Sequence, residues 1–266
     1  MRRQQWVVLG VALGASIVLW NFPRVVVEND AVAMRSQIDS VTTEHVKMSS
    51  EQKNRIDSLK HYLSTSAYKA SLDSLIAIFQ RFQMYDSAGF YAEYVAKRFP
   101  SKELFKQAGD LYYEAYTYAL NSQKEMHLSE KVREMFQKAQ QLGENNPDMQ
   151  VKIGMTYVNS ATPMQGIQMI RDVLAQHPRH RLALLNLGIL SMQSGQYEKA
   201  IERFETLKTI DSTDVQTRIY LGVCWYKLKK YQQAKQELEI AQTLTQDPQA
   251  LATIDAYLQP ILTTSK

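Results

Sequence analysis

The sequence predicts an all-α protein whose body is built from repeated pairs of helices. Two observations support this fold class. The 266 residues include only ten glycines and seven prolines, and turn-rich β-sheet proteins need more of both residues at their connections. Three of the glycines, Gly154, Gly188 and Gly222, are spaced 34 residues apart. A fixed period of this length is the signature of a helical repeat array.

The charge balance argues against a nucleic-acid partner. The formal net charge of +4 results from 31 basic and 27 acidic residues, and no basic run is longer than Lys229–Lys230. Nucleic-acid-binding domains instead concentrate basic residues in a patch or along a helix. The single cysteine, Cys224, has no second cysteine with which to pair, so it does not indicate a compartment.

Residues 1–27 have the order of an export signal or a membrane anchor. A basic start at residues 1–3 precedes an uncharged run from Trp6 to Trp20, and apolar residues continue to position 22. The run is of marginal length, because fifteen helical residues reach only about 22 Å of a hydrocarbon core of about 30 Å. Residues 21–24 lack the small side chains of a cleavage site. We therefore expect an uncleaved anchor at residues 6–22, and a cleaved signal is the alternative.

The charges around this segment predict its orientation. Two arginines and the terminal amine precede the span, whereas Arg24 beyond it is offset by Glu28 and Asp30. The positive-inside rule then places the N-terminus in the cytoplasm and the rest of the chain on the other side.

Gly10 and Gly14 form a GxxxG pattern within the predicted span. Small residues at this spacing let two membrane helices approach closely, which would produce a homodimer. Glycine is also common in membrane helices that stay single, so both interpretations are open.

Residues 28–66 are expected to form a helical stalk or linker. Ser49 and Gln52 have the spacing of a capping box for a helix that carries Ile56, Leu59 and Leu63. A short parallel coiled coil is the alternative, although fewer than three clean heptads are present.

Further positions repeat at the same period as the three glycines. Aromatic or small residues stand three places after each glycine, small residues twelve places after, and large apolar residues sixteen places after. In that order these are Tyr157, Ser191 and Trp225, then Gly166, Ala200 and Ala234, then Ile170, Phe204 and Leu238. Small residues let two antiparallel helices touch, and the larger ones fill the space between them.

This pattern resembles the tetratricopeptide repeat (TPR) family, whose unit is a 34-residue helix-turn-helix. The resemblance implies an α-solenoid that winds as a right-handed superhelix. The residues that define the repeats here are Gly109, Gly154, Gly188, Ala200, Phe204, Gly222, Trp225 and Ala234.

The predicted array covers residues 67–248, with clear copies at 147–180, 181–214 and 215–248. An earlier copy at about 102–146 carries an insertion, which an elongated first helix through Tyr118 and a loop near residues 121–125 would absorb. A degenerate copy at about 69–101 has Ile76 where a small residue is expected. Residues 249–266 supply a capping helix and tail, as solenoids require.

The resemblance also implies a concave groove, lined by the first helix of each pair, that binds a protein partner. The expected groove residues are Val151, Met155, Asn159, Leu185, Asn186, Ile189, Met192, Tyr220, Val223 and Tyr226. They are mostly apolar and aromatic, which suits an apolar or helical segment of a partner. Packing between repeats is the alternative role of these side chains.

Some family members hold the C-terminal carboxylates of chaperones with lysine, asparagine and arginine side chains. Asn186 fits the middle position of that clamp, but Val151 and Met155 replace the first pair. We therefore do not expect a chaperone-tail clamp.

No feature of the sequence indicates catalysis, a cofactor or a metal. Phosphate-loop, GxGxxG, HExxH, CxxC and GxSxG motifs are all absent from it. His177 and His180 are three residues apart, but no third ligand lies near them in sequence.

The leading hypothesis is a single-pass, membrane-anchored TPR scaffold that is not an enzyme. It would hold protein partners on the periplasmic face of a bacterial inner membrane. The alternative is a periplasmic holding chaperone or an assembly factor for export, envelope assembly or cytochrome c maturation.

Overall fold

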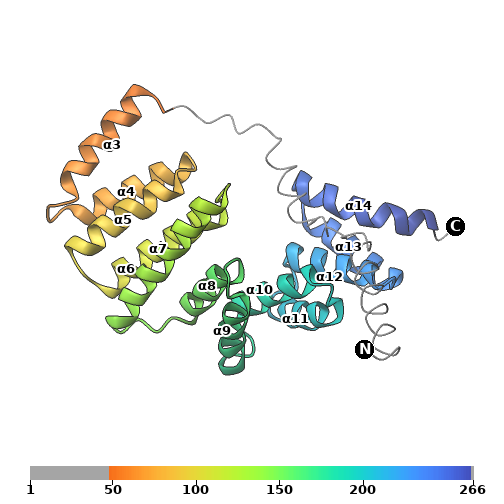
Figure 1. Ribbon diagram of the computed structural model, residues 1–266. Helices are drawn as coiled ribbons and strands as arrows, with labels where there is room; N and C mark the ends of the chain where they lie inside the picture. Colours follow the sequence, from red (N-terminus) through yellow and green to blue (C-terminus); the bar gives the residue numbers. More distant parts are fainter. Residues whose placement is uncertain (1–47, 265–266) are drawn as a thin grey trace, which may run out of the picture. The chain divides into compact units, whose positions relative to one another are not determined.

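The computed structural model describes residues 48–264, which fold into α-helices without a strand in that range (Figure 1). The predicted all-α class is confirmed. The helices are α3 (Ser50–Tyr62), α4 (Tyr68–Arg81), α5 (Tyr85–Arg98), α6 (Lys102–Thr117), α7 (Ser122–Gln141), α8 (Pro147–Val158), α9 (Pro163–Gln176), α10 (Arg181–Gln193), α11 (Tyr197–Ile210), α12 (Val215–Lys227), α13 (Tyr231–Leu244) and α14 (Pro248–Thr264).

The predicted anchor at residues 6–22, with Gly10 and Gly14, lies outside the described residues. Within residues 48–264, no helix combines the length and the apolar character that a membrane span requires.

The helices pack in chain order, each against the next (Figure 1). In addition, α8 contacts α10, the first helix of the next copy, and α12 contacts the C-terminal helix α14. A chain that makes mostly neighbouring contacts buries its apolar surface between successive helices rather than around one centre. The buried side chains accordingly form several clusters along the array.

Local signals in the sequence fix where several helices begin. The capping box predicted at Ser49 is confirmed: Ser49 Oγ accepts from the backbone N–H of Gln52, and the Gln52 side chain accepts from the Ser49 N–H. The side chains of Asn121 and Asn146 cap α7 and α8 by accepting from one backbone N–H each, and a proline begins α8 and α9. These groups satisfy backbone donors that no helical carbonyl can reach.

Helix α3 belongs to the packed body rather than to a separate stalk. Ile56 and Leu63 are buried in the same cluster as Leu72, Leu75 and Phe79 of α4. We expected residues 50–66 in the linker. Instead, they cover the apolar side of α4 at the N-terminal end of the helical array.

The insertion in copy 102–146 extends the second helix more than the first. Helix α7 has 20 residues and α6 has 16, whereas the helices of the clear copies have 12 to 14. The prediction of a loop near residues 121–125 is wrong, because Asn121 caps α7 and residues 122–125 form the first turn of that helix.

The periodic glycines lie where paired helices cross. A Cβ atom added at Gly188 would lie 2.5 Å from Phe204, and one at Gly222 would lie 2.6 Å from Leu238. In the same way, a Cβ at Gly154 would lie 2.7 Å from Ile170, and one at Gly109 would lie 2.5 Å from Phe136. A Cβ at these distances would force its neighbour to shift, so glycine permits the closest approach of the paired helices.

Candidate partner-binding face

The expected groove residues lie on three successive first helices, α8, α10 and α12. We call this set of side chains, together with their neighbours on α6, the first-helix face. Eight of the ten are half-buried or exposed, namely Met155, Asn159, Leu185, Asn186, Ile189, Met192, Tyr220 and Tyr226.

The remaining two expected groove residues do not line an open surface. Val151 is fully buried in a cluster with Ile170 and Leu187, and Val223 is 9% exposed in a cluster with Leu238. Both side chains lie between helices. For these two residues, the alternative role of packing between repeats is therefore correct.

The α6–α8 end of the first-helix face is polar. Asp110 Oδ2 lies 2.7 Å from Lys106 Nζ, and Asp110 Oδ1 lies 2.5 Å from Lys152 Nζ, so one carboxylate joins two lysines from adjacent copies. The Lys152 ammonium also lies 5.6 Å from the centroid of the Tyr113 ring. These contacts join adjacent copies, and both lysines are half-buried.

Asn159 and Met155 are engaged with the preceding copy. The Tyr116 hydroxyl donates to the Met155 carbonyl at 3.2 Å, and Asn159 Nδ2 donates to Glu125 at 2.7 Å. Burial raises the pKa of Tyr116, so its hydroxyl stays protonated and keeps donating.

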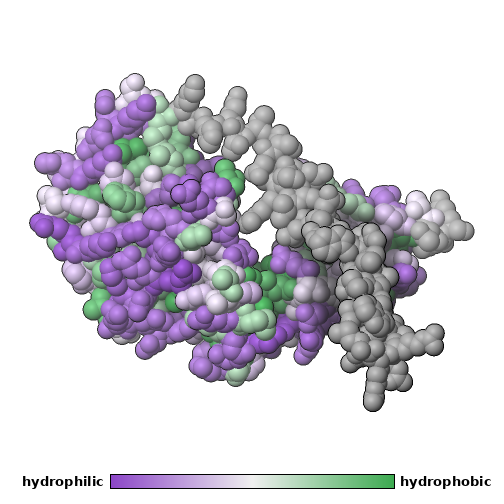
Figure 2. All heavy atoms as spheres, viewed as in Figure 1, coloured by the Kyte–Doolittle hydropathy of each residue, from purple (hydrophilic) through white to green (hydrophobic). Residues whose placement is uncertain are grey.

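The α10 part of the face is apolar. Leu185, Ile189 and Met192 are half-buried and pack at the edge of the cluster around Phe204. Figure 2 shows a hydrophobic patch over α10 between hydrophilic areas. The Asn186 amide donates to the Leu182 carbonyl at 2.8 Å, so its nitrogen already has a partner in its own helix.

Aromatic rings continue the face on α12. Tyr220 stacks on Phe204 with centroids 5.0 Å apart, and burial raises the pKa of Tyr220. Tyr226 makes edge contacts with Tyr231 and Tyr257. The face therefore changes from paired charges at α6–α8 to leucine, isoleucine, methionine and tyrosine at α10–α12.

The residues that define the repeats are placed between helices rather than on this face. Ala200, Phe204 and Ala234 are fully buried. Trp225 is half-buried, and the Lys230 ammonium lies 5.0 Å from its ring centroid.

Two buried carboxylates were not predicted. Glu93 accepts from Tyr112 and Lys131, and Glu237 accepts from Lys208 and Arg218. Lys97, four residues after Glu93, also pairs with that carboxylate, but these other partners are 19 to 38 residues away in sequence, so local spacing does not predict the two clusters. Each carboxylate joins helices of the body and has no open side for a ligand, since Glu93 and Glu237 are buried.

The groups with potential chemical reactivity have structural roles. His180 caps α10 by accepting from the Ala183 N–H, and its Nε2 lies 3.3 Å from Asp148. Burial raises the pKa of the Cys224 thiol to about 12. Within residues 48–264, no three histidine, cysteine, aspartate or glutamate side chains gather to hold a metal.

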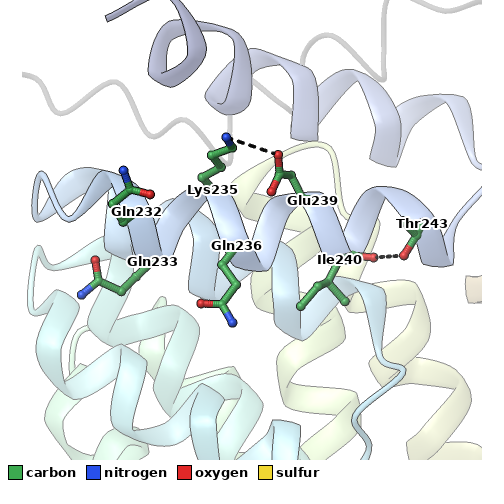
Figure 3. A pocket seen from close by; sticks show the side chains of 7 residues that line it. All are labelled: Gln232, Gln233, Lys235, Gln236, Glu239, Ile240 and Thr243. Atoms are coloured by element: carbon green, nitrogen blue, oxygen red, sulfur yellow. Dashed lines mark hydrogen bonds and ion pairs between the residues drawn. The ribbon is translucent and has the colours of Figure 1, made fainter. Parts of the chain in front are cut away.

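The outer side of α13 has a different character from the first-helix face. Figure 3 shows seven side chains of this helix lining a shallow pocket, namely Gln232, Gln233, Lys235, Gln236, Glu239, Ile240 and Thr243. Lys235 and Glu239 form an ion pair of 3.7 Å there. This side is almost wholly polar, so it offers little to an apolar segment.

Comparison with solved structures identifies the fold. A tetratricopeptide repeat protein from Parabacteroides merdae matches with a TM-score of 0.54 and 15% identity over 79% of this chain and 78% of that one. The chain therefore has the TPR fold.

Two further solved structures match less well. The MamA protein has a TM-score of 0.47 and 15% identity over 68% of this chain and 93% of its own. YrrB, described as a TPR protein with an unusual peptide-binding site, has a TM-score of 0.44 and 14% identity over 74% of this chain and 96% of its own. No protein-family model and no curated protein matches the sequence.

Proposed function

We propose that the protein is a membrane-anchored scaffold that binds protein partners through the first-helix face. The observation that carries this proposal is the row of half-buried Leu185, Ile189, Met192 and Tyr226 on α10 and α12. Side chains of this kind form adaptable surfaces for an apolar or helical segment. The TPR fold supports it, because stacked helix pairs create extended binding surfaces.

The location is part of the proposal and rests on the sequence. Residues 6–22 would anchor the chain in a bacterial inner membrane with the N-terminus in the cytoplasm and the TPR body in the periplasm. A reporter active only outside the cytoplasm, fused after Lys266, should be active. Activity of a cytoplasmic reporter at that position would contradict the topology.

The partner site is tested by a photoreactive amino acid at Ile189 of the full chain in intact cells. We expect an adduct of one discrete mass, and no adduct from the same amino acid at Gln236 on the outer side of α13. Equal cross-linking at both positions would contradict the proposed face.

The same experiment separates the two functions suggested by the sequence. A scaffold with one partner gives one adduct, whereas a holding chaperone, the alternative, gives a broad distribution of adducts with many unfolded clients. The partner identified in the discrete adduct would name the pathway.

A further inference from the structure

Helix α5 carries two aromatic rings that do not pack into the body. Phe90 is 57% exposed and Tyr94 is 46% exposed. The opposite side of α5, with Ala92 and Val95, is buried in a cluster shared with α4 and α6. Within residues 48–264, no other helix exposes two aromatic rings one turn apart on the same side. The two rings are therefore available to a partner outside the body.

Basic side chains continue the same side of α5. Lys97 and Arg98 follow the two rings by about one turn, and both are exposed. Residues four, seven and eight positions after Phe90 share its side of a helix. We call these four residues, Phe90, Tyr94, Lys97 and Arg98, the α5 ridge.

Neighbouring helices add lysines on both sides of the α5 ridge. On one side, Lys60 Nζ of α3 lies 5.4 Å from the centroid of the Tyr91 ring, and this ring contacts Phe90 edge to face at 5.2 Å. On the other side, Lys131 Nζ of α7 lies 2.9 Å from Glu93 Oε1. The exposed rings are thus bordered by basic groups from three helices.

The lysines and carboxylates around the α5 ridge leave a surplus of positive charge. Three lysines, Lys97, Lys131 and Lys138, meet only two carboxylates, those of Glu93 and Glu134. The lysine of α3 pairs with an aspartate of its own helix, so it adds no surplus.

Arg98 adds a further positive charge, because it has no acidic partner among the described residues. The wider sequence shows the same trend. Residues 48–101, which contain α3, α4 and α5, have seven basic and five acidic residues, whereas residues 102–264 have 18 of each. The net positive charge of the described body therefore lies in the segment that carries the α5 ridge.

We propose that the α5 ridge docks on a membrane surface that contains anionic lipids. Aromatic rings next to lysine and arginine are typical of protein surfaces that lie at the level of the lipid headgroups. The surplus of positive charge complements anionic headgroups. A nucleic acid fits less well, because it requires a denser basic patch than this one. The contact uses only residues of the described body and does not depend on the proposed anchor.

Quenching of a fluorescent label by spin-labelled lipid tests the contact. The purified full chain is combined with nanodiscs of phosphatidylcholine, with or without anionic phosphatidylglycerol. Cys224 is buried, so a cysteine introduced at an exposed position takes the label. We compare Phe90→Cys with Leu142→Cys, which is also exposed, at 48%, and follows the end of α7.

If the proposal is correct, the label at residue 90 is quenched about threefold or more above the label at residue 142, and only with the anionic lipid. Raising the salt from about 0.1 M to about 1 M should reduce this quenching, because the range of the charges falls from about 10 Å to about 3 Å. Equal quenching at the two positions, or the same quenching without anionic lipid, would overturn the proposal.

Two further substitutions, in the chain labelled at residue 90, test the charge and the second ring. Arg98→Gln should lower the ratio of docked to free chains about fivefold, which is the effect of one cation at an anionic surface. Arg171→Gln changes an exposed arginine of α9 and should leave the ratio unchanged. Tyr94→Ser should lower it without loss of helical circular dichroism, because the ring is exposed. An unchanged ratio in Arg98→Gln would contradict the proposal.

A photoreactive amino acid at residue 90 in intact cells distinguishes a lipid from a protein partner. A protein adduct of discrete mass, without quenching by lipid in the purified system, would overturn the proposal. The anchor is tested separately by the same material. A chain that is soluble without detergent and is still quenched at residue 90 refutes the anchor and supports the contact. A chain that stays in the membrane but is quenched equally at both positions refutes the contact alone.

Discussion

A methyl group at residue 188 has no room in this fold, because it would lie 2.5 Å from the Phe204 ring. We expect Gly188→Ala to lower the free energy of unfolding by about 1–3 kcal/mol, since overpacking costs that much in well-packed cores. This loss should exceed the gain of up to about 1 kcal/mol from the helix propensity of alanine. Urea unfolding of the purified protein measures the difference.

The Phe204→Leu background provides the control for this substitution. A smaller side chain opposite residue 188 should reduce the penalty of Gly188→Ala, so the two effects should not add. An equal penalty in both backgrounds would mean that the ring is not the obstacle.

Residue patterns predicted the TPR fold but not every individual contact. The fixed period predicts that Gly154, Gly188 and Gly222 lie at helix crossings, whereas no pattern in the sequence predicts the role of Gly89. In the structure, a Cβ at Gly89 would lie 2.6 Å from the Tyr112 ring of α6. This position is glycine because a tyrosine 23 residues later packs on it, and a single sequence does not show such pairs. Val151 and Val223 likewise look like groove residues until their neighbouring helices are placed.

At the scale of helices, a buried carboxylate joins α5 to α6 and α7. Burial by itself would raise the pKa of Glu93, but hydrogen bonds from Lys97, Tyr112 and Lys131 outweigh burial and lower the pKa to about 2, from 4.5. A carboxyl group with a lowered pKa stabilises the fold when ionised. Its contribution is complete above pH 4.5 and is lost as the pH falls towards 2.

We therefore expect acid to destabilise the protein through this group, by up to about 3 kcal/mol between these limits. Unfolding by urea at a series of pH values measures the slope. Glu93→Gln should flatten the slope in this range, and the exposed Glu239→Gln should leave it unchanged. A wild-type slope in Glu93→Gln would show that other carboxyl groups are responsible.

Caps, prolines and the repeat period predict the helices of the clear copies, but they do not predict the structure of the inserted residues. Asn121 has the chemistry of a helix cap in the sequence, yet we interpreted residues 121–125 as a loop because the period offered no position for them. The packing of α3 was missed for a related reason. Ile56 and Leu63 form an apolar stripe, and only the structure shows that α4 has a face for it.

For the described body as a whole, stability at the C-terminus depends on the capping helix. Ile254, Leu258 and Ile261 of α14 are at most 4% exposed and cover α12 and α13. A chain ending at Asp247 should lose several kcal/mol, because each large apolar side chain contributes about 1.5–3 kcal/mol when buried.

The loss should be confined to the neighbouring copies, since repeats contact only their neighbours. Amide hydrogen exchange should become faster in α12 and α13 and stay unchanged in α4 and α5. A chain ending at Leu262 keeps the three buried side chains and is the control. Unchanged exchange in α13 after removal of α14 would contradict the capping role.

The crossing of α8 and α9 differs from the others, because both of its small positions are glycine. At Gly166 an added Cβ would collide with the Gly154 carbonyl oxygen, a backbone atom, whereas at Gly188 it meets the ring of a side chain. In a genetic selection for function, damage at residue 188 should therefore have second-site suppressors at Phe204. A damaging substitution at residue 166 should have no second-site suppressor at Gly154, because no substitution there removes a main-chain oxygen.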